Sequence, residues 1–156
     1  KLLALALIAA AGAAHADTIS FSDSFGLAKT NWTHTLSLQQ FDTSLGTLNS
    51  VTFNYGGQVS TLFKLESLDA APATLTANSS ASLVFGGPIA NTLNIAGSAS
   101  TGVQAFDGVI DFGGTSGAVV GPVVGNKADV LTLLAGLGAY EGLGTFGISV
   151  DANRRS

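Results

Sequence analysis

Residues 31–38, NWTHTLSL, alternate between larger apolar or aromatic side chains and small hydroxyl side chains. A β-strand points successive side chains to opposite faces of a sheet, so a period of two is typical of a half-buried strand. One face of this stretch carries Trp32, His34, Leu36 and Leu38. The stretch therefore predicts a strand with one face in the core and the other in solvent.

The same alternation continues on both sides of Gly56-Gly57. Val51, Phe53 and Tyr55 share one face before the two glycines, and residues 59–65 repeat the pattern after them. A glycine pair between two alternating runs favours a hairpin turn. Six further strands are expected at residues 18–25, 74–85, 92–96, 103–112, 118–124 and 145–150.

The composition agrees with many short strands. Gly, Ser, Thr, Ala, Asn and Val dominate from Asp17 onward, and charged residues make up only 10% of the chain. This mixture favours strands and turns over surface helices, so we predict an all-β fold, an antiparallel β-sandwich. Residues 128–142 depart from the pattern with a candidate helix cap at Asn126 or Asp129, and we expect one short helical turn near residues 129–136.

The first sixteen residues predict a signal peptide. An apolar run follows Lys1, and it ends in Ala14-His15-Ala16, which places small residues at the two positions that a signal peptidase reads. The run is shorter than the roughly 18 to 20 residues of a permanent membrane anchor. We expect cleavage after Ala16, a single domain over residues 17–156, and an exported protein that is extracellular or at the cell surface.

Charge and cysteine content exclude several function classes. The net charge is −4, and removal of the leader with Lys1 makes the remaining chain more negative still. A mildly acidic chain without a basic cluster is not expected to bind nucleic acid. Cysteine is absent, which excludes thiol catalysis and thiolate metal ligands.

The catalytic inventory is poor, and we expect no enzyme activity. His34 is the one histidine outside the leader, and no Gly-x-Ser-x-Gly motif supplies it with a nucleophile. We expect His34 to be a partly buried strand residue. Most carboxylates lie beside Gly, Ser or Ala, where an aspartate side chain commonly bonds backbone amides in turns. A hydrolase with two acids remains an alternative, but no pattern brings two acids to one cleft.

The stretch AFDGVIDFGGTSG, residues 105–117, holds the one candidate metal site. If it forms a strand, Asp107 and Asp111 lie on the same face and could supply two of the six to eight oxygens that calcium takes. The alternative is that both aspartates form turns. The glycines that follow lack the lysine of a phosphate-binding loop, and apart from calcium no cofactor is expected.

Three stretches together resemble the choice-of-anchor E domain of exported bacterial proteins. They are NWTHTLSLQQFDTSLGTLNSVTFNYGGQV at 31–59, FKLESLDAAPATLT at 63–76 and AFDGVIDFGGTSG at 105–117. In that family a Trp-bearing strand leads into a Phe-Asp-x-x-Leu-Gly-Thr-Leu turn, which residues 41–48 match. Later come Phe-Asp-Gly and Asp-Phe-Gly-Gly-Thr-Ser-Gly, which residues 106–108 and 111–117 match.

The resemblance implies an exported, non-enzymatic module of the cell surface or extracellular matrix. Its alternative is a carbohydrate- or calcium-binding module associated with exopolysaccharide. Expected partners are exopolysaccharide or other surface components, together with sorting machinery that reads a C-terminal signal, such as the PEP-CTERM type, not present in this chain. Family members continue beyond this chain's last residue, so we expect that the domain is truncated at its C-terminus.

Overall fold

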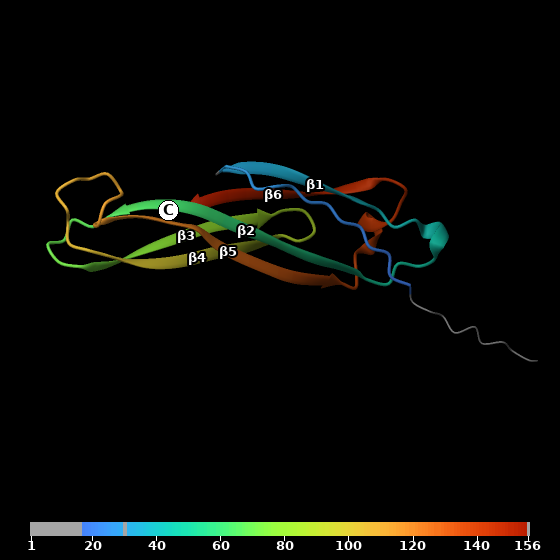
Figure 1. The fold of residues 1–156 in the computed structure, drawn as a ribbon. Helices are drawn as coiled ribbons and strands as arrows, with labels where there is room; N and C mark the ends of the chain where they lie inside the picture. Colours follow the sequence, from blue (N-terminus) through green and yellow to red (C-terminus); the bar gives the residue numbers. More distant parts are fainter. Residues whose placement is uncertain (1–16, 30, 156) are drawn as a thin grey trace, which may run out of the picture.

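The computed structural model describes residues 17–29 and 31–155, so the predicted cleavage residues Ala14 and Ala16 lie outside the described part. The described residues form six strands and two short 3-10 helices (Figure 1). The strands are β1 (Trp32–Gln39), β2 (Val51–Glu66), β3 (Ala73–Phe85), β4 (Asn91–Val103), β5 (Gly117–Leu133) and β6 (Thr145–Arg155). The 3-10 helices are η1 (Thr43–Leu45) and η2 (Leu137–Tyr140), and no described helix has the length and apolar character to cross a membrane.

The strands form two antiparallel sheets, which confirms the predicted all-β sandwich. One sheet has four strands in the order β1-β6-β3-β4, and the other pairs β2 with β5. The longest strands, β2 and β5, lie across one face of the four-stranded sheet (Figure 1). Their apolar side chains on the inner face therefore meet those of the larger sheet.

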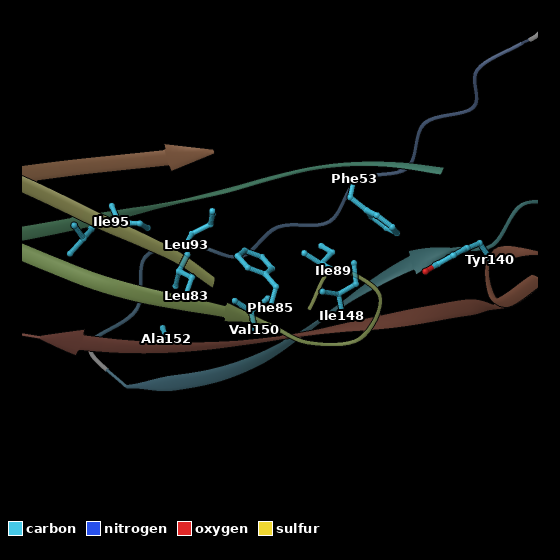
Figure 2. Close-up of a cluster of buried hydrophobic side chains, with 11 residues drawn as sticks. Phe53, Leu83, Phe85, Ile89, Leu93, Ile95, Tyr140, Ile148, Val150 and Ala152 are labelled. Carbon is cyan, nitrogen blue, oxygen red and sulfur yellow. The ribbon is translucent and has the colours of Figure 1, made fainter. Parts of the chain in front are cut away.

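The main core lies between the sheets and toward one end. Leu93, Ile95, Ile148 and Val150 are almost completely buried there. Figure 2 shows them in one cluster with Phe53 of β2 and Tyr140 of η2. A smaller cluster of Ala77, Val120 and Val123 lies elsewhere between the sheets. Beside these residues the hydroxyl oxygens of Thr61 and Ser79 are 2.7 Å apart, so the two buried polar groups satisfy each other.

The predicted hairpin at Gly56-Gly57 is wrong, because β2 continues through both residues without a turn. Gly57 pairs with Lys127 in the middle of the β2–β5 ladder. A Cβ atom at Gly57 would collide with Cδ1 of Leu83 in the opposite sheet. The glycine thus gives the facing sheet room to approach, a role that periodicity alone does not distinguish from a turn.

A second close approach joins the sheets along β4 and β5. A Cβ atom at Gly97 would lie 2.7 Å from the carbonyl oxygen of Val124. Only a residue without a side chain lets the two backbones come this near. The two sheets therefore meet backbone to backbone on this side of the sandwich.

The expected helical turn near residues 129–136 lies further along the chain. Residues up to Leu133 belong to β5, and the helical turn is η2, Leu137–Tyr140. Leu131 and Leu133 are partly buried while Thr132 is exposed, so the period of two extends through this segment. Pairing with β2 therefore overrides the local helix signals, and η2 begins only after Gly136, whose φ of 69° ends the extended run.

The segment before β1 is extended but forms no strand, so the strand predicted at 18–25 is wrong. Side chains of this segment, and not a backbone ladder, attach it to β1. Asp23 Oδ2 accepts a hydrogen bond of 2.7 Å from the Ser37 amide, and the Phe25 ring packs edge-on against Trp32 at 4.3 Å. His34 contacts the same ring at 4.5 Å yet is exposed, not partly buried as expected, because β1 is an edge strand.

Candidate functional site

The region singled out by its two aspartates is a loop between β4 and β5, not a strand. The strand predicted at 103–112 stops at Val103, and β5 starts only at Gly117. The loop lies at the end of the sandwich where β2 ends and β5 begins (Figure 1). Its base is closed by backbone bonds from Gln104 N to Thr115 O at 2.9 Å and from Phe106 N to Asp69 O at 2.8 Å.

Asp107 forms the first turn of this loop. Its Oδ1 accepts a hydrogen bond from the Val109 amide and its Oδ2 from the Thr115 amide, both at 3.1 Å. These amide bonds, first that of Val109 and then that of Thr115, hold the pKa of the Asp107 carboxyl below its ordinary value of 3.8. Both carboxylate oxygens therefore bond the backbone, as in the turn alternative.

Asp111 forms the second turn. Its Oδ1 accepts a hydrogen bond of 2.8 Å from the Gly113 amide. Phe112, which lies between Asp111 and Gly113, has a φ of 58°, a left-handed conformation that a bulky residue rarely takes. The two aspartates thus hold successive turns and do not share a strand face.

Glu66 is the residue of this site that the sequence did not single out. It stands at the end of β2, and its two oxygens accept hydrogen bonds from the Ser116 hydroxyl at 2.5 Å and the Phe112 amide at 2.7 Å. Ser116 is fully buried, and its hydroxyl oxygen also accepts a bond of 3.3 Å from the Asp107 amide. One carboxylate therefore connects the loop tip, the loop base and the sheet.

These contacts bear on the calcium prediction for Asp107 and Asp111. Backbone amides donate to both oxygens of Asp107 and to one oxygen of Asp111. Over residues 17–29 and 31–155, no three or more acidic, histidine or cysteine side chains gather in a way that could hold a metal ion. Calcium binding remains a prediction, and the geometry gives both aspartates a turn-forming role.

A separate hollow lies where β1 begins beside β6 and β3. It has a volume of about 450 Å³ and is open to solvent. Its lining combines apolar, amide, hydroxyl and carboxylate groups from Asn31, Trp32, Thr33, Val84, Asp151, Ala152 and Asn153. The Thr33 hydroxyl donates a bond of 2.6 Å to Asp151 Oδ1, which fixes the carboxylate at the wall. Sequence reasoning missed this site because it needs the pairing of residues 118 apart.

Comparison of the chain with protein-family models, with curated proteins and with solved structures finds no match.

Proposed function

We propose that the protein is an exported, non-enzymatic module of the cell surface or extracellular matrix. The observation that carries the proposal is how the chain uses its acids. Asp23, Asp42, Asp107 and Asp111 each accept backbone amide bonds, and in these contacts the carboxylates hold segments in place. A hydrolase needs carboxylates directed at a substrate, whereas a scaffold uses them to fix its turns.

The outer face of the four-stranded sheet supports the same role. The register places Thr76 opposite Ser100 and Ser82 opposite Asn94, all on the face away from the core. Small uncharged hydroxyl and amide groups of this kind make a surface for contact and not for charge-driven binding. The predicted leader, outside the described residues, supplies the expectation of export.

Export and surface position can be tested with one engineered thiol, since these 156 residues contain no cysteine. Leu143→Cys places a thiol at a residue that is 83% exposed. Intact cells making the precursor with its leader are treated with a membrane-impermeant maleimide. Labelling before lysis is expected, with a cytoplasmic single-cysteine protein as the unlabelled control. Labelling only after lysis contradicts the proposal.

A carbohydrate-binding module is the second candidate, and the hollow beside Asp151 favours it. A sugar ring offers apolar C–H faces and hydroxyls, which match Val84 together with the carboxylate of Asp151 and the amide of Asn153. Glycan-array binding that is lost in Asp151→Asn with Asn153→Ala supports this function. Asn54→Ala, an exposed amide of the other sheet, is the matched control. Equal binding by the wild type, the double variant and the Asn54→Ala control, or no binding by the wild type, rules out the carbohydrate-binding function.

A further inference from the structure

The loop of residues 104–116 displays an apolar tip. Val109, Ile110 and Phe112 are 57%, 62% and 42% exposed. The bonds from Asp107, Asp111 and Glu66 hold their backbone in one conformation. A cluster of exposed apolar side chains on a fixed loop is unlike the scattered single residues of an ordinary surface, and it marks a contact site.

The backbone conformation of Phe112 also supports a contact site at the tip. A left-handed φ is unfavourable for a bulky residue, and two hydrogen bonds maintain it here, from the Phe112 amide to Glu66 and from the Gly113 amide to Asp111. The strain does not serve to bury the ring, which stays exposed. A strained position that presents an apolar ring to solvent is explained if the ring is covered by something else.

A second apolar surface lies on the outer face of β2 and β5. We call it the bulge patch, since the β2–β5 register shifts between Thr61 and Phe63. Leu62, Val119 and Val124 are 59%, 58% and 43% exposed there. The register places the exposed Lys64 beside Val119, so the patch carries a positive charge at its border.

The apolar tip and the bulge patch lie at the same end of the molecule. Lys64 is two residues before the end of β2, and Val119 is two residues after the start of β5. The loop that carries the tip enters β5 at Gly117, at the end of the sandwich where these strands meet (Figure 1). A two-fold axis at this end would bring each tip onto the patch of the other molecule.

We propose that the tip and the bulge patch form a symmetric contact between two copies of this chain. Ile110 and Phe112 cover Leu62 and Val119 of the second copy, and Asp111 meets its Lys64. Each surface then contacts its complement twice, which closes the dimer. The complementary charges favour this occupant over a lipid surface, because insertion of the tip in a membrane would bury Asp111 between its two apolar neighbours.

The first test is the self-association of the whole chain, measured by sedimentation velocity over a range of concentrations. Wild-type protein is expected to shift from monomer to dimer. Ile110→Thr and Val119→Thr each act at two symmetry-related contacts and should raise the dimer dissociation constant by about tenfold or more. Leu143→Thr removes an apolar side chain that is 83% exposed outside both surfaces, and it should leave association unchanged.

The second test locates the contact. Singly substituted Ile110→Cys and Val119→Cys chains, one with a size tag, are mixed and oxidised; an otherwise cysteine-free chain gives a clean background. A disulfide between the tagged and untagged chains is expected, and Leu143→Cys should not replace either partner. Thermal unfolding of each variant checks that it is folded.

Three results overturn the proposal. One is a wild-type protein that stays monomeric at every concentration. Another is a dimer that neither threonine variant weakens while the variants remain folded. The third is co-sedimentation with neutral phosphatidylcholine vesicles that depends on Ile110, since a lipid surface is then the occupant of the tip. None of these results affects the test of export described above.

Discussion

At one end of the sandwich Phe53, Tyr140 and Phe146 pack ring against ring, with centroids 5.1 to 6.2 Å apart. At the opposite end Glu66 and Ser116 hold the loop of residues 104–116 through hydrogen bonds, and the apolar side chains of that loop face solvent. Burial of apolar surface is insensitive to pH and spread over many contacts, whereas a few charged hydrogen bonds are concentrated and titratable. The two ends should therefore fail under different perturbations.

The largest effect is expected at the aromatic end. Phe53→Ala removes a ring that is 93% buried and leaves a cavity between the sheets, which should lower the free energy of unfolding by about 3–5 kcal/mol. Urea unfolding measures the change. Phe21→Ala, at a ring 44% exposed, is the control and should cost far less. Similar losses in the two variants would show that the aromatic cluster is not the main source of stability.

At the polar end, Glu66→Ala should cost about 1.5–3 kcal/mol. The substitution leaves the buried Ser116 hydroxyl and the Phe112 amide without their acceptor. Hydrogen exchange should show faster exchange at the Phe112 amide, with little change in β1 or β6. Glu66→Gln keeps an acceptor and should lose less. Uniformly faster exchange across the sandwich would mean that the loop is not a separate unit.

A smaller effect of opposite sign is expected from Phe112→Asn. Asparagine accepts a left-handed backbone more readily than phenylalanine, so the folded chain should gain up to about 1 kcal/mol as a monomer. Phe21→Asn, at an exposed ring without a positive φ, is the control and should bring no gain. Thermal unfolding at low concentration measures both, and a loss in Phe112→Asn would mean that the ring supports the loop.

The smallest effect concerns pH and belongs to the polar end. Backbone amide bonds lower the pKa of Asp107 in the folded state, so the folded chain binds its proton less readily than the unfolded chain. The resulting stabilisation is complete above the ordinary pKa of 3.8 and is lost as the pH falls through 3.8 toward the lower folded value. Asp107→Asn should show a smaller acid loss than wild type in urea unfolding at pH 7 and pH 3. Equal losses would assign the acid sensitivity to other groups.

Local alternation predicted most of the strands, although residues 18–25 form no strand and the run at 103–112 is a loop after Val103. Trp32, Leu36 and Leu38 are partly buried on the face that NWTHTLSL predicts, while His34 on the same predicted face is exposed. The fold class follows from many such alternating runs. The prediction from alternation failed where contacts between distant parts of the chain decide the local structure. Gly57 looks like a turn residue until Leu83 of the other sheet is placed against it, and residues 129–133 look like a helix start until β2 pairs with them.

In the candidate site, too, roles set by sequence neighbours could be predicted and roles set by distant contacts could not. The turn role of Asp107 follows from its neighbours, because its bond to the Val109 amide spans two residues. The role of Glu66 does not, since its partner Ser116 is 50 residues away. The hollow beside Asp151 depends on an even longer pairing, that of β1 with β6. Contacts of this range leave no periodic signal in a single sequence.

The hydrogen bond between Asp23 and the Ser37 amide has a consequence for solubility. An edge strand such as β1 offers backbone donors on which another chain can add a strand and begin to aggregate. Asp23 occupies one of these donors and places a negative charge beside it, so an incoming strand would have to displace a carboxylate. The segment before β1 thus makes the edge of this strand less available for pairing with another chain, in a protein that is rich in β-structure and poor in charge.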